Sequence, residues 1–263
     1  MKKIFLLLFF ITQNSFAQDK DFVLGKITTL HSTELNEDRI LNIYLPEGYM
    51  SNESYPVIYL LDGSANEDFI HIVGLVQFAN FEWVKLLPKS IIVGIENVDR
   101  KRDFTYPTTV EKDKKDYPTT GGSAKFIAFI EKELQPFIEN KYKTTSSKTI
   151  IGQSLGGLLA TEILYKKPTL FSQFIIISPS LWWNKESLLK EKARFLDNDF
   201  NQKTNVFIGV GKEGSVMEND AKELFKIVSE RKLMHTDFKF FENKNHATIL
   251  HSAVYSAFES FND

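Results

Sequence analysis

One short segment limits the possible folds of this chain more than any other. Residues 149–160 read Thr-Ile-Ile-Gly-Gln-Ser-Leu-Gly-Gly-Leu-Leu-Ala, which predicts an apolar strand, a Gly-x-Ser-x-Gly turn and an apolar helix. In such a turn the serine backbone is strained, and its hydroxyl stands above the carboxyl edge of a parallel sheet. Gly152 and Gly156 are expected to be required, because a Cβ at either position would collide with the tight turn. Ser154 is therefore the candidate nucleophile.

The rest of the chain alternates between strand and helix patterns. Strands are predicted at 56–61, 90–95, 147–151, 174–177, 206–210 and 238–241, and helices at 124–140, 155–167, 218–232 and 247–261. Pro136 is expected to kink the first of these helices. Residues 22–45 contain two strand-like stretches around a polar turn, which favours an antiparallel hairpin. The pattern predicts an α/β fold, with a mostly parallel central sheet and helices on both faces.

Composition narrows the class of protein. With 263 residues and 43% apolar content, the chain is able to bury one large core as a single domain. The formal net charge is −2, with acidic and basic residues interspersed, so nothing indicates a nucleic-acid partner.

The first residues resemble a secretory signal peptide. Two lysines precede the apolar run 4–11, and Ser15-Phe16-Ala17 places small residues before a cut between Ala17 and Gln18. The run is far shorter than the roughly 20 residues that a membrane anchor needs. No cysteine is present to carry a lipid or a disulfide. We therefore expect a signal peptide at 1–17 and an exported, periplasmic or secreted domain at 18–263, without a membrane anchor.

A serine hydroxyl needs a base within hydrogen-bond reach, and histidine has the appropriate pKa. His246 follows the last predicted strand and precedes the last helix, which places it at the same sheet edge as Ser154. His251 is the alternative, one turn into that helix. The remaining histidines, His31, His71 and His235, are expected to be structural.

The acid that orients the histidine is expected in the loop after the strand at 206–210. Glu213 lies nearest the strand end and is the preferred candidate. Glu218 and Asp220 are alternatives, although acidic residues there also suit the N-terminus of a helix.

The developing oxyanion requires two main-chain N–H donors. One is expected from Leu155, at the start of the helix that follows the serine. The other is expected from the loop after the strand at 56–61, at Ser64, with Gly63 allowing close approach of the substrate.

Two loops are expected to line the substrate pocket. Trp182 and Trp183 follow a central strand, and we expect their rings to stack on a sugar or aryl group of the substrate. Burial in the core is an equally common position for tryptophan and remains the alternative. Arg100, Arg102 and Tyr106 follow the strand at 90–95, and the arginines suit a carboxylate or catecholate. A surface loop held by Arg–Asp pairs remains an equal alternative.

Several motifs together resemble a known family. They are Leu-Leu-Asp-Gly at 60–63, Gly-Ile-Glu-Asn at 94–97, Gly-Gln-Ser-Leu-Gly-Gly at 152–157, Ser-Pro-Ser-Leu-Trp-Trp at 178–183 and His-Ala-Thr at 246–248. The chain resembles the putative esterase (esterase D-like) family of α/β-hydrolases, which includes siderophore trilactone, feruloyl and acetyl-xylan esterases and S-formylglutathione hydrolases. Periplasmic siderophore esterases are the most similar.

The resemblance implies an α/β-hydrolase fold, with Ser154 as nucleophile, His246 as base, and Leu155 and the Gly63–Ser64 turn as oxyanion donors. The acid varies within the family, so Glu213 depends on its position in the chain. We expect a serine ester hydrolase that uses no cofactor or metal and acts on a small-molecule or glycan-linked ester, such as a siderophore ester. An acyltransferase and a non-catalytic glycan- or siderophore-binding protein remain alternatives, and the oligomeric state is open.

Overall fold

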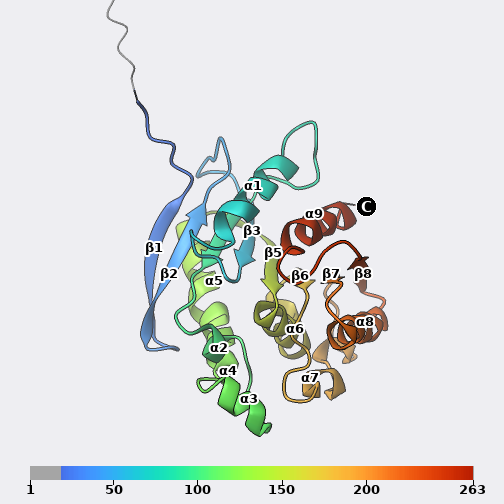
Figure 1. The fold of residues 1–263 in the computed structure, drawn as a ribbon. Helices are drawn as coiled ribbons and strands as arrows, with labels where there is room; N and C mark the ends of the chain where they lie inside the picture. Colours follow the sequence, from blue (N-terminus) through green and yellow to red (C-terminus); the bar gives the residue numbers. More distant parts are fainter. Residues whose placement is uncertain (1–18, 263) are drawn as a thin grey trace, which may run out of the picture.

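Eight strands form one mixed sheet in the computed structural model, which describes residues 19–262. They are β1 (Lys26–Ser32), β2 (Glu37–Tyr44), β3 (Tyr55–Leu60), β4 (Ile91–Ile95), β5 (Thr144–Gln153), β6 (Gln173–Ile177), β7 (Thr204–Gly211) and β8 (Met234–Phe241). Their order across the sheet is β1-β2-β4-β3-β5-β6-β7-β8 (Figure 1). The pairs β1–β2 and β2–β4 are antiparallel and the others parallel. The predicted α/β-hydrolase architecture is confirmed. The proposed signal peptide and its cut site lie outside the described residues.

Helices cover both faces of the sheet. One face carries α1 (Phe69–Ala79) and α9 (Leu250–Ser260), and the other carries α6 (Leu155–Lys166), α8 (Ser215–Ser229) and the segment from α4 (Ser123–Phe129) through a π-helical turn (Ile130–Leu134) to α5 (Gln135–Lys141). Shorter elements lie between them: α2 (Arg100–Asp103), α3 (Glu111–Asp116), α7 (Ser187–Lys190) and two 3₁₀ turns (Pro168–Leu170 and Arg194–Leu196). Among the described residues, none of these helices has both the length and the apolar character that crossing a bilayer requires.

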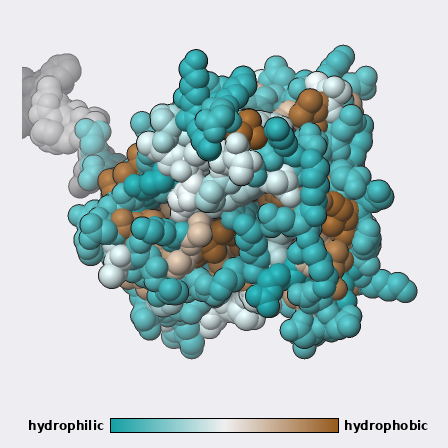
Figure 2. Space-filling model, turned by 90° about the horizontal axis from the view of Figure 1, so that it is seen from below, coloured by the Kyte–Doolittle hydropathy of each residue, from teal (hydrophilic) through white to brown (hydrophobic). Residues whose placement is uncertain are grey.

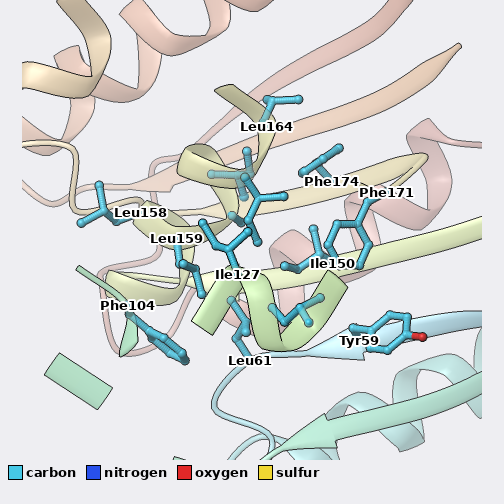
Figure 3. Packing of buried hydrophobic residues seen from close by; sticks show 14 of the residues in the cluster. Tyr59, Leu61, Phe104, Ile127, Ile150, Leu158, Leu159, Leu164, Phe171 and Phe174 are labelled. Atoms are coloured by element: carbon cyan, nitrogen blue, oxygen red, sulfur yellow. The ribbon is translucent and has the colours of Figure 1, made fainter. Parts of the chain in front are cut away.

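Strand alternation creates two hydrophobic cores, one on each face of the sheet. Tyr59 and Ile150 belong to the core on the side of α6 and α4, together with Leu159 and Ile127 (Figure 3). The neighbouring strand residues, such as Ile58 and Ile151, belong to the core beneath α1 and α9. Because helices cover both faces of the sheet, the sequences of the parallel strands are continuous apolar runs. The loops at the strand ends are therefore the parts of these βα units that are available to bind a substrate.

The helix predicted at 124–140 contains a π-helical turn immediately before Pro136. Gln135 N–H donates to the carbonyl of Ile130, five residues back, instead of four. Proline has no N–H, and its ring clashes with the carbonyl four residues earlier, so a wider turn relieves the conflict. The structure therefore accommodates Pro136 by local widening within an otherwise continuous helical segment.

Candidate active site

Ser154 occupies the sharp turn between β5 and α6. Its backbone angles, φ 62° and ψ −120°, lie in a region that non-glycine residues seldom adopt. The turn is held by neighbours on both sides, because Ser154 N–H donates to Ile177 O at 3.0 Å and Ser180 N–H donates to Ser154 O at 3.0 Å. The strained conformation is thus fixed by β6 and the loop that follows it.

The glycines around Ser154 have different roles from those expected. A Cβ at Gly152 would lie 2.3 Å from Gly156 O, so that glycine is required, as predicted. A Cβ at Gly156 would come no closer than 3.4 Å to Asp62 Oδ2, so the prediction for this glycine is wrong. Instead, Gly157 is the second required position, since a Cβ there would lie 2.9 Å from both Ile177 O and Pro179 Cα.

The two adjacent glycines therefore offer a matched pair of variants. Gly157→Ala is expected to lower the free energy of unfolding by about 1–3 kcal/mol, because backbone must move to admit the methyl group. Gly156→Ala is expected to change stability by less than about 1 kcal/mol, since its methyl group would make only ordinary van der Waals contacts and alanine favours the helix. Urea unfolding of both variants measures the difference. Equal destabilisation by the two substitutions would contradict this account of the turn.

His246 and Glu213 form a hydrogen-bonded pair at the carboxyl edge of the sheet. His246 follows β8, Glu213 follows β7, and His246 Nδ1 lies 2.6 Å from Glu213 Oε2. The other carboxylate oxygen of Glu213 accepts from Ser178 Oγ at 2.5 Å and from Gly211 N–H at 3.0 Å. Burial alone would raise the pKa of Glu213, but these three hydrogen bonds outweigh it and lower the pKa. The carboxylate is therefore ionised at neutral pH.

The two alternative acids lie elsewhere in the structure. Glu218 accepts from the N–H groups of Glu213 and Gly214, both at 3.1 Å, so it serves the N-terminus of α8. Asp220 is buried on α8, and its Oδ2 has no hydrogen-bond partner among the described residues. Of the three acidic candidates, Glu213 is the one in contact with His246.

Asp220 itself gives a prediction about stability. Burial, with a smaller contribution from Glu186, raises the pKa of Asp220 from 3.8 to about 6. The ionised form is therefore disfavoured in the folded protein above pH 6, and this cost disappears below about pH 4, where the group is protonated in both states. Asp220→Asn is expected to raise the free energy of unfolding by about 1 kcal/mol at pH 8. The gain should vanish at pH 4, which urea unfolding at the two pH values tests; a gain independent of pH would contradict it.

Ser154 and His246 line the same cleft, which has two adjoining parts. One part, of about 520 Å³, is also lined by Asp62, Glu67, Asp68 and Arg100. The other, of about 530 Å³, is also lined by Ser180, Trp182, Lys212, Glu213 and Met217. A larger depression of about 690 Å³ lies at the opposite ends of β5 and β6, away from this pair. The serine and the histidine thus both line the junction of two chemically different compartments.

The hydroxyl of Ser154 is oriented toward a neighbouring serine in this structure. Its Oγ lies 3.4 Å from Ser180 Oγ, while the main-chain carbonyl of His246 accepts a hydrogen bond from the Gln153 side chain. Catalytic hydrogen bonds commonly tighten only when substrate binds. Among the described residues, Ser180 Oγ is the side-chain partner of Ser154 Oγ, and no hydrogen bond joins Ser154 to the imidazole of His246.

Two of the three residues expected at the oxyanion hole are free to donate. Leu155 is the first residue of α6, so its N–H has no partner within the helix, and neither it nor the N–H of Ser64 has an acceptor among residues 19–262. In the Gly63–Ser64 turn, Gly63 is not an available donor, because its N–H donates to Ile95 O at 3.0 Å. A Cβ on Gly63 would lie 2.4 Å from Gly94 Cα, so the glycine permits the close approach of β4.

Two aromatic residues expected in the pocket belong instead to the core. Trp183 is fully buried, and its indole N–H donates to Tyr106 O at 2.9 Å. Tyr106 is 4% exposed, its hydroxyl lies 3.1 Å from Ser187 Oγ, and burial raises its pKa to about 12. The substrate-binding predictions for Trp183 and Tyr106 are therefore wrong. Trp182, by contrast, lines the cleft beside Met217.

The two arginines expected in the pocket also separate. Arg100 lines the cleft and binds Asp62 through Nε at 2.6 Å and Nη2 at 2.8 Å. Arg102 instead pairs with Glu37 at 2.6 Å and with Asp103 at 2.7 Å, outside the cleft. The substrate-binding prediction for Arg102 is wrong, since its charge is used to fasten the loop to β2.

The other histidines lie away from the pair formed by His246 and Glu213. His31 contacts Asp38 on the β1–β2 hairpin, and His235 contacts Asp237 within β8. The rings of His71 on α1 and His251 on α9 meet edge to face, with centroids 4.9 Å apart. None of these four side chains lines the cleft that contains Ser154.

Sequence reasoning missed the buried support of the site. Ser178, which donates to Glu213, and Asp62, which holds Arg100, both adopt positive φ values, 43° and 55°. Both residues lie within the sequence motifs that follow β6 and β3, so the sequence identifies the motifs. It does not identify the hydrogen-bond partners, because these come from distant loops.

The chain matches known proteins along most of its length. The model of the family described as "Putative esterase" matches residues 32–258. The chain is 33% identical over 238 residues to the ferri-bacillibactin esterase BesA of Bacillus subtilis, covering 82% of each protein. Its fold is similar to a solved IroE-like serine hydrolase from Shewanella oneidensis, with 31% identity, a TM-score of 0.81 and coverage of 90% of this chain and 80% of the other. It is also similar to the solved BES protein from Bacillus cereus, with 27% identity, a TM-score of 0.83 and coverage of 95% of this chain and 100% of the other.

Proposed function

The chain belongs to the putative esterase family and is a carboxylic ester hydrolase, and we propose that it acts through a covalent acyl-enzyme on Ser154. Ser154 Oγ attacks the ester carbonyl while His246 Nε2 takes its proton, and Glu213 stabilises the imidazolium. The N–H groups of Leu155 and Ser64 receive the oxyanion. His246 then protonates the departing alcohol, and water, activated by the same histidine, releases the acid.

One observation carries this proposal. The hydrogen bond between His246 Nδ1 and Glu213, at 2.6 Å, requires the proton on Nδ1 because an ionised carboxylate only accepts. Nε2 then holds the lone pair that a general base needs. Since His246 lines the same cleft as the strained Ser154, the basic nitrogen and the nucleophile are available to one substrate.

For the substrate we propose a siderophore or carbohydrate-linked ester. The name of BesA gives ferri-bacillibactin as the substrate of that relative. In this chain the cleft offers Trp182 and Met217 for an aryl group on one side, and Arg100 with carboxylates for polar groups on the other. From below, near α2, α3 and α7, the surface is mostly hydrophilic with small separate hydrophobic patches, which favours a polar ester over a lipid surface (Figures 1 and 2).

A substrate panel tests this proposal. Rates on p-nitrophenyl acetate, a feruloyl sugar and a ferric catecholate trilactone are compared, and kcat/KM for one of the last two is expected to exceed the aryl acetate value. A fluorophosphonate reagent should inactivate the enzyme and label the peptide containing Ser154, as mass spectrometry would show. Labelling at another residue would refute the assigned nucleophile, and equal weak rates on every ester would refute the substrate class.

We further propose that the protein is exported. The support is the pattern of residues 1–17, in which two lysines precede an apolar run and small residues precede the cut. Intact mass measurement after expression with the full N-terminus is expected to give a mature chain that begins at Gln18. Full-length protein recovered from the cytoplasm would refute the proposal.

A further inference from the structure

A buried amide on β2 lies directly behind the proposed oxyanion hole. Asn42 is 2% exposed, and its Nδ2 donates to Gly63 O at 2.9 Å and to Glu96 Oε1 at 2.8 Å. Both neighbours are acceptors, so the two amide hydrogens are used and the orientation of the side chain is fixed. Without these two hydrogen bonds, the buried amide would lower the free energy of unfolding.

The carbonyl that accepts from Asn42 belongs to the Gly63–Ser64 peptide, which also carries the proposed oxyanion donor. Gly63 C=O and Ser64 N–H are parts of the same planar peptide, and in a trans peptide they point in opposite directions. The N–H and C=O of Gly63 both point toward β4 and β2, where they meet Ile95 O and the Asn42 amide. Because β3 lies between β4 and β5, the N–H of Ser64 points toward β5, the strand that leads to Ser154 (Figure 1).

We infer that Asn42 is a positioning residue with two effects on the Ser64 N–H. It orients this N–H toward the oxyanion, and it increases the polarity of the N–H bond. It touches no substrate and acts through the Gly63–Ser64 peptide. A hydrogen bond to the carbonyl draws electron density from the N–H of the same peptide, which strengthens that donor. This inference rests on the proposed function, since it assumes an oxyanion formed on the Ser154 ester adduct.

The decisive variant is Asn42→Leu, which keeps the number and branching of the side-chain heavy atoms but removes the donor. Losing one oxyanion donor costs about 100- to 1,000-fold in rate, so disorienting one is expected to lower kcat by about 10- to 100-fold. KM for p-nitrophenyl acetate should change by less than about threefold, because the effect is confined to the transition state. The inhibition constant of phenylboronic acid, which forms a tetrahedral adduct with a serine hydroxyl, should rise in parallel.

Gln135→Leu is the matched control. Gln135 is also buried, and its amide also donates to a main-chain carbonyl, that of Leu170 at 3.1 Å, beside the depression at the opposite end of the strands. Each variant loses one amide–carbonyl hydrogen bond and one hydrogen bond with a charged side chain, Glu96 for Asn42 and Lys148 for Gln135, so the two are expected to lose similar stability. Gln135→Leu should retain kcat within about threefold. An equal loss of kcat in the two variants would reduce Asn42 to a structural role and overturn the inference.

A second variant covers the case in which Asn42→Leu does not fold. Asn42→Asp keeps the shape, and its carboxyl donates to Gly63 O only when protonated. The ratio of its kcat to that of the wild type is therefore expected to rise as the pH falls from 8 to 5. A flat ratio, or a folded Asn42→Leu with wild-type kcat and boronate affinity, would overturn the inference. A wild type that hydrolyses no ester would instead overturn the proposed function itself.

Discussion

Replacing Ser154 with alanine is expected to lower kcat for ester hydrolysis by about 10⁴-fold or more, the loss seen when a triad nucleophile is removed from a serine hydrolase. Alanine keeps the Cβ and the backbone, so the turn between β5 and α6, with φ 62° at this position, is expected to survive. Initial rates on p-nitrophenyl acetate, together with far-ultraviolet circular dichroism, measure the two effects separately.

Ser180→Ala is the control for that variant. Ser180 lines the same cleft, and its Oγ lies 3.4 Å from Ser154 Oγ, so its removal alters the surroundings without removing the nucleophile. We expect its kcat to stay within about tenfold of the wild type. If Ser154→Ala kept more than a small fraction of activity while Ser180→Ala lost it, the assignment of the nucleophile would be wrong.

Replacing Glu213 with glutamine is expected to lower kcat by about 10⁴-fold, although the two side chains have the same shape. Ser178 Oγ and Gly211 N–H both donate to Oε1 of Glu213, so the glutamine oxygen is held on that side. Its NH₂ group then faces His246 Nδ1, which must accept instead of donate. The proton moves to Nε2, and the imidazole no longer takes a proton from Ser154.

Asp220→Asn provides the comparison for Glu213→Gln. It changes another buried carboxylate of the same region to an amide, but Asp220 lies on α8 and lines neither part of the cleft. We expect it to retain kcat and to gain stability at pH 8, while Glu213→Gln retains stability better than activity. Steady-state kinetics at saturating substrate test both. Wild-type kcat in Glu213→Gln would show that His246 works without this acid.

The local parts of the fold were predictable because their signals are local. The strand–turn–helix around Ser154 is encoded in twelve consecutive residues, 149–160, whose apolar pattern and glycines act on one another directly. The contact of Glu213 with His246 followed from a rule about parallel sheets, in which strand ends share one edge. Neither needed knowledge of how distant side chains pack.

The wrong predictions concern side-chain direction and contacts between remote segments. A tryptophan or tyrosine in a loop suits either a pocket or a core. Trp183 and Tyr106 are both buried, and each hydrogen-bonds to a main-chain carbonyl of the other, 77 positions away. Arg102 forms an ion pair with Glu37, which lies on the antiparallel hairpin. Gly157 is required because Pro179, in the loop after β6, crosses it closely. Such pairings arise only when the complete tertiary structure is assembled.

The division of the cleft has a consequence for redesign. The compartment with Arg100 is built from the loops that follow β3 and β4, whereas the compartment with Trp182 is built from those that follow β6 and β7. We propose that the two halves of the ester, acid and alcohol, contact these separate pieces of the chain. Because Ser64 and Glu213 lie in the loops after β3 and β7, exchanging whole loops would disturb the reacting centre. Substituting single lining side chains, such as Arg100 or Trp182, would instead retune recognition of one half of the ester and leave that centre in place.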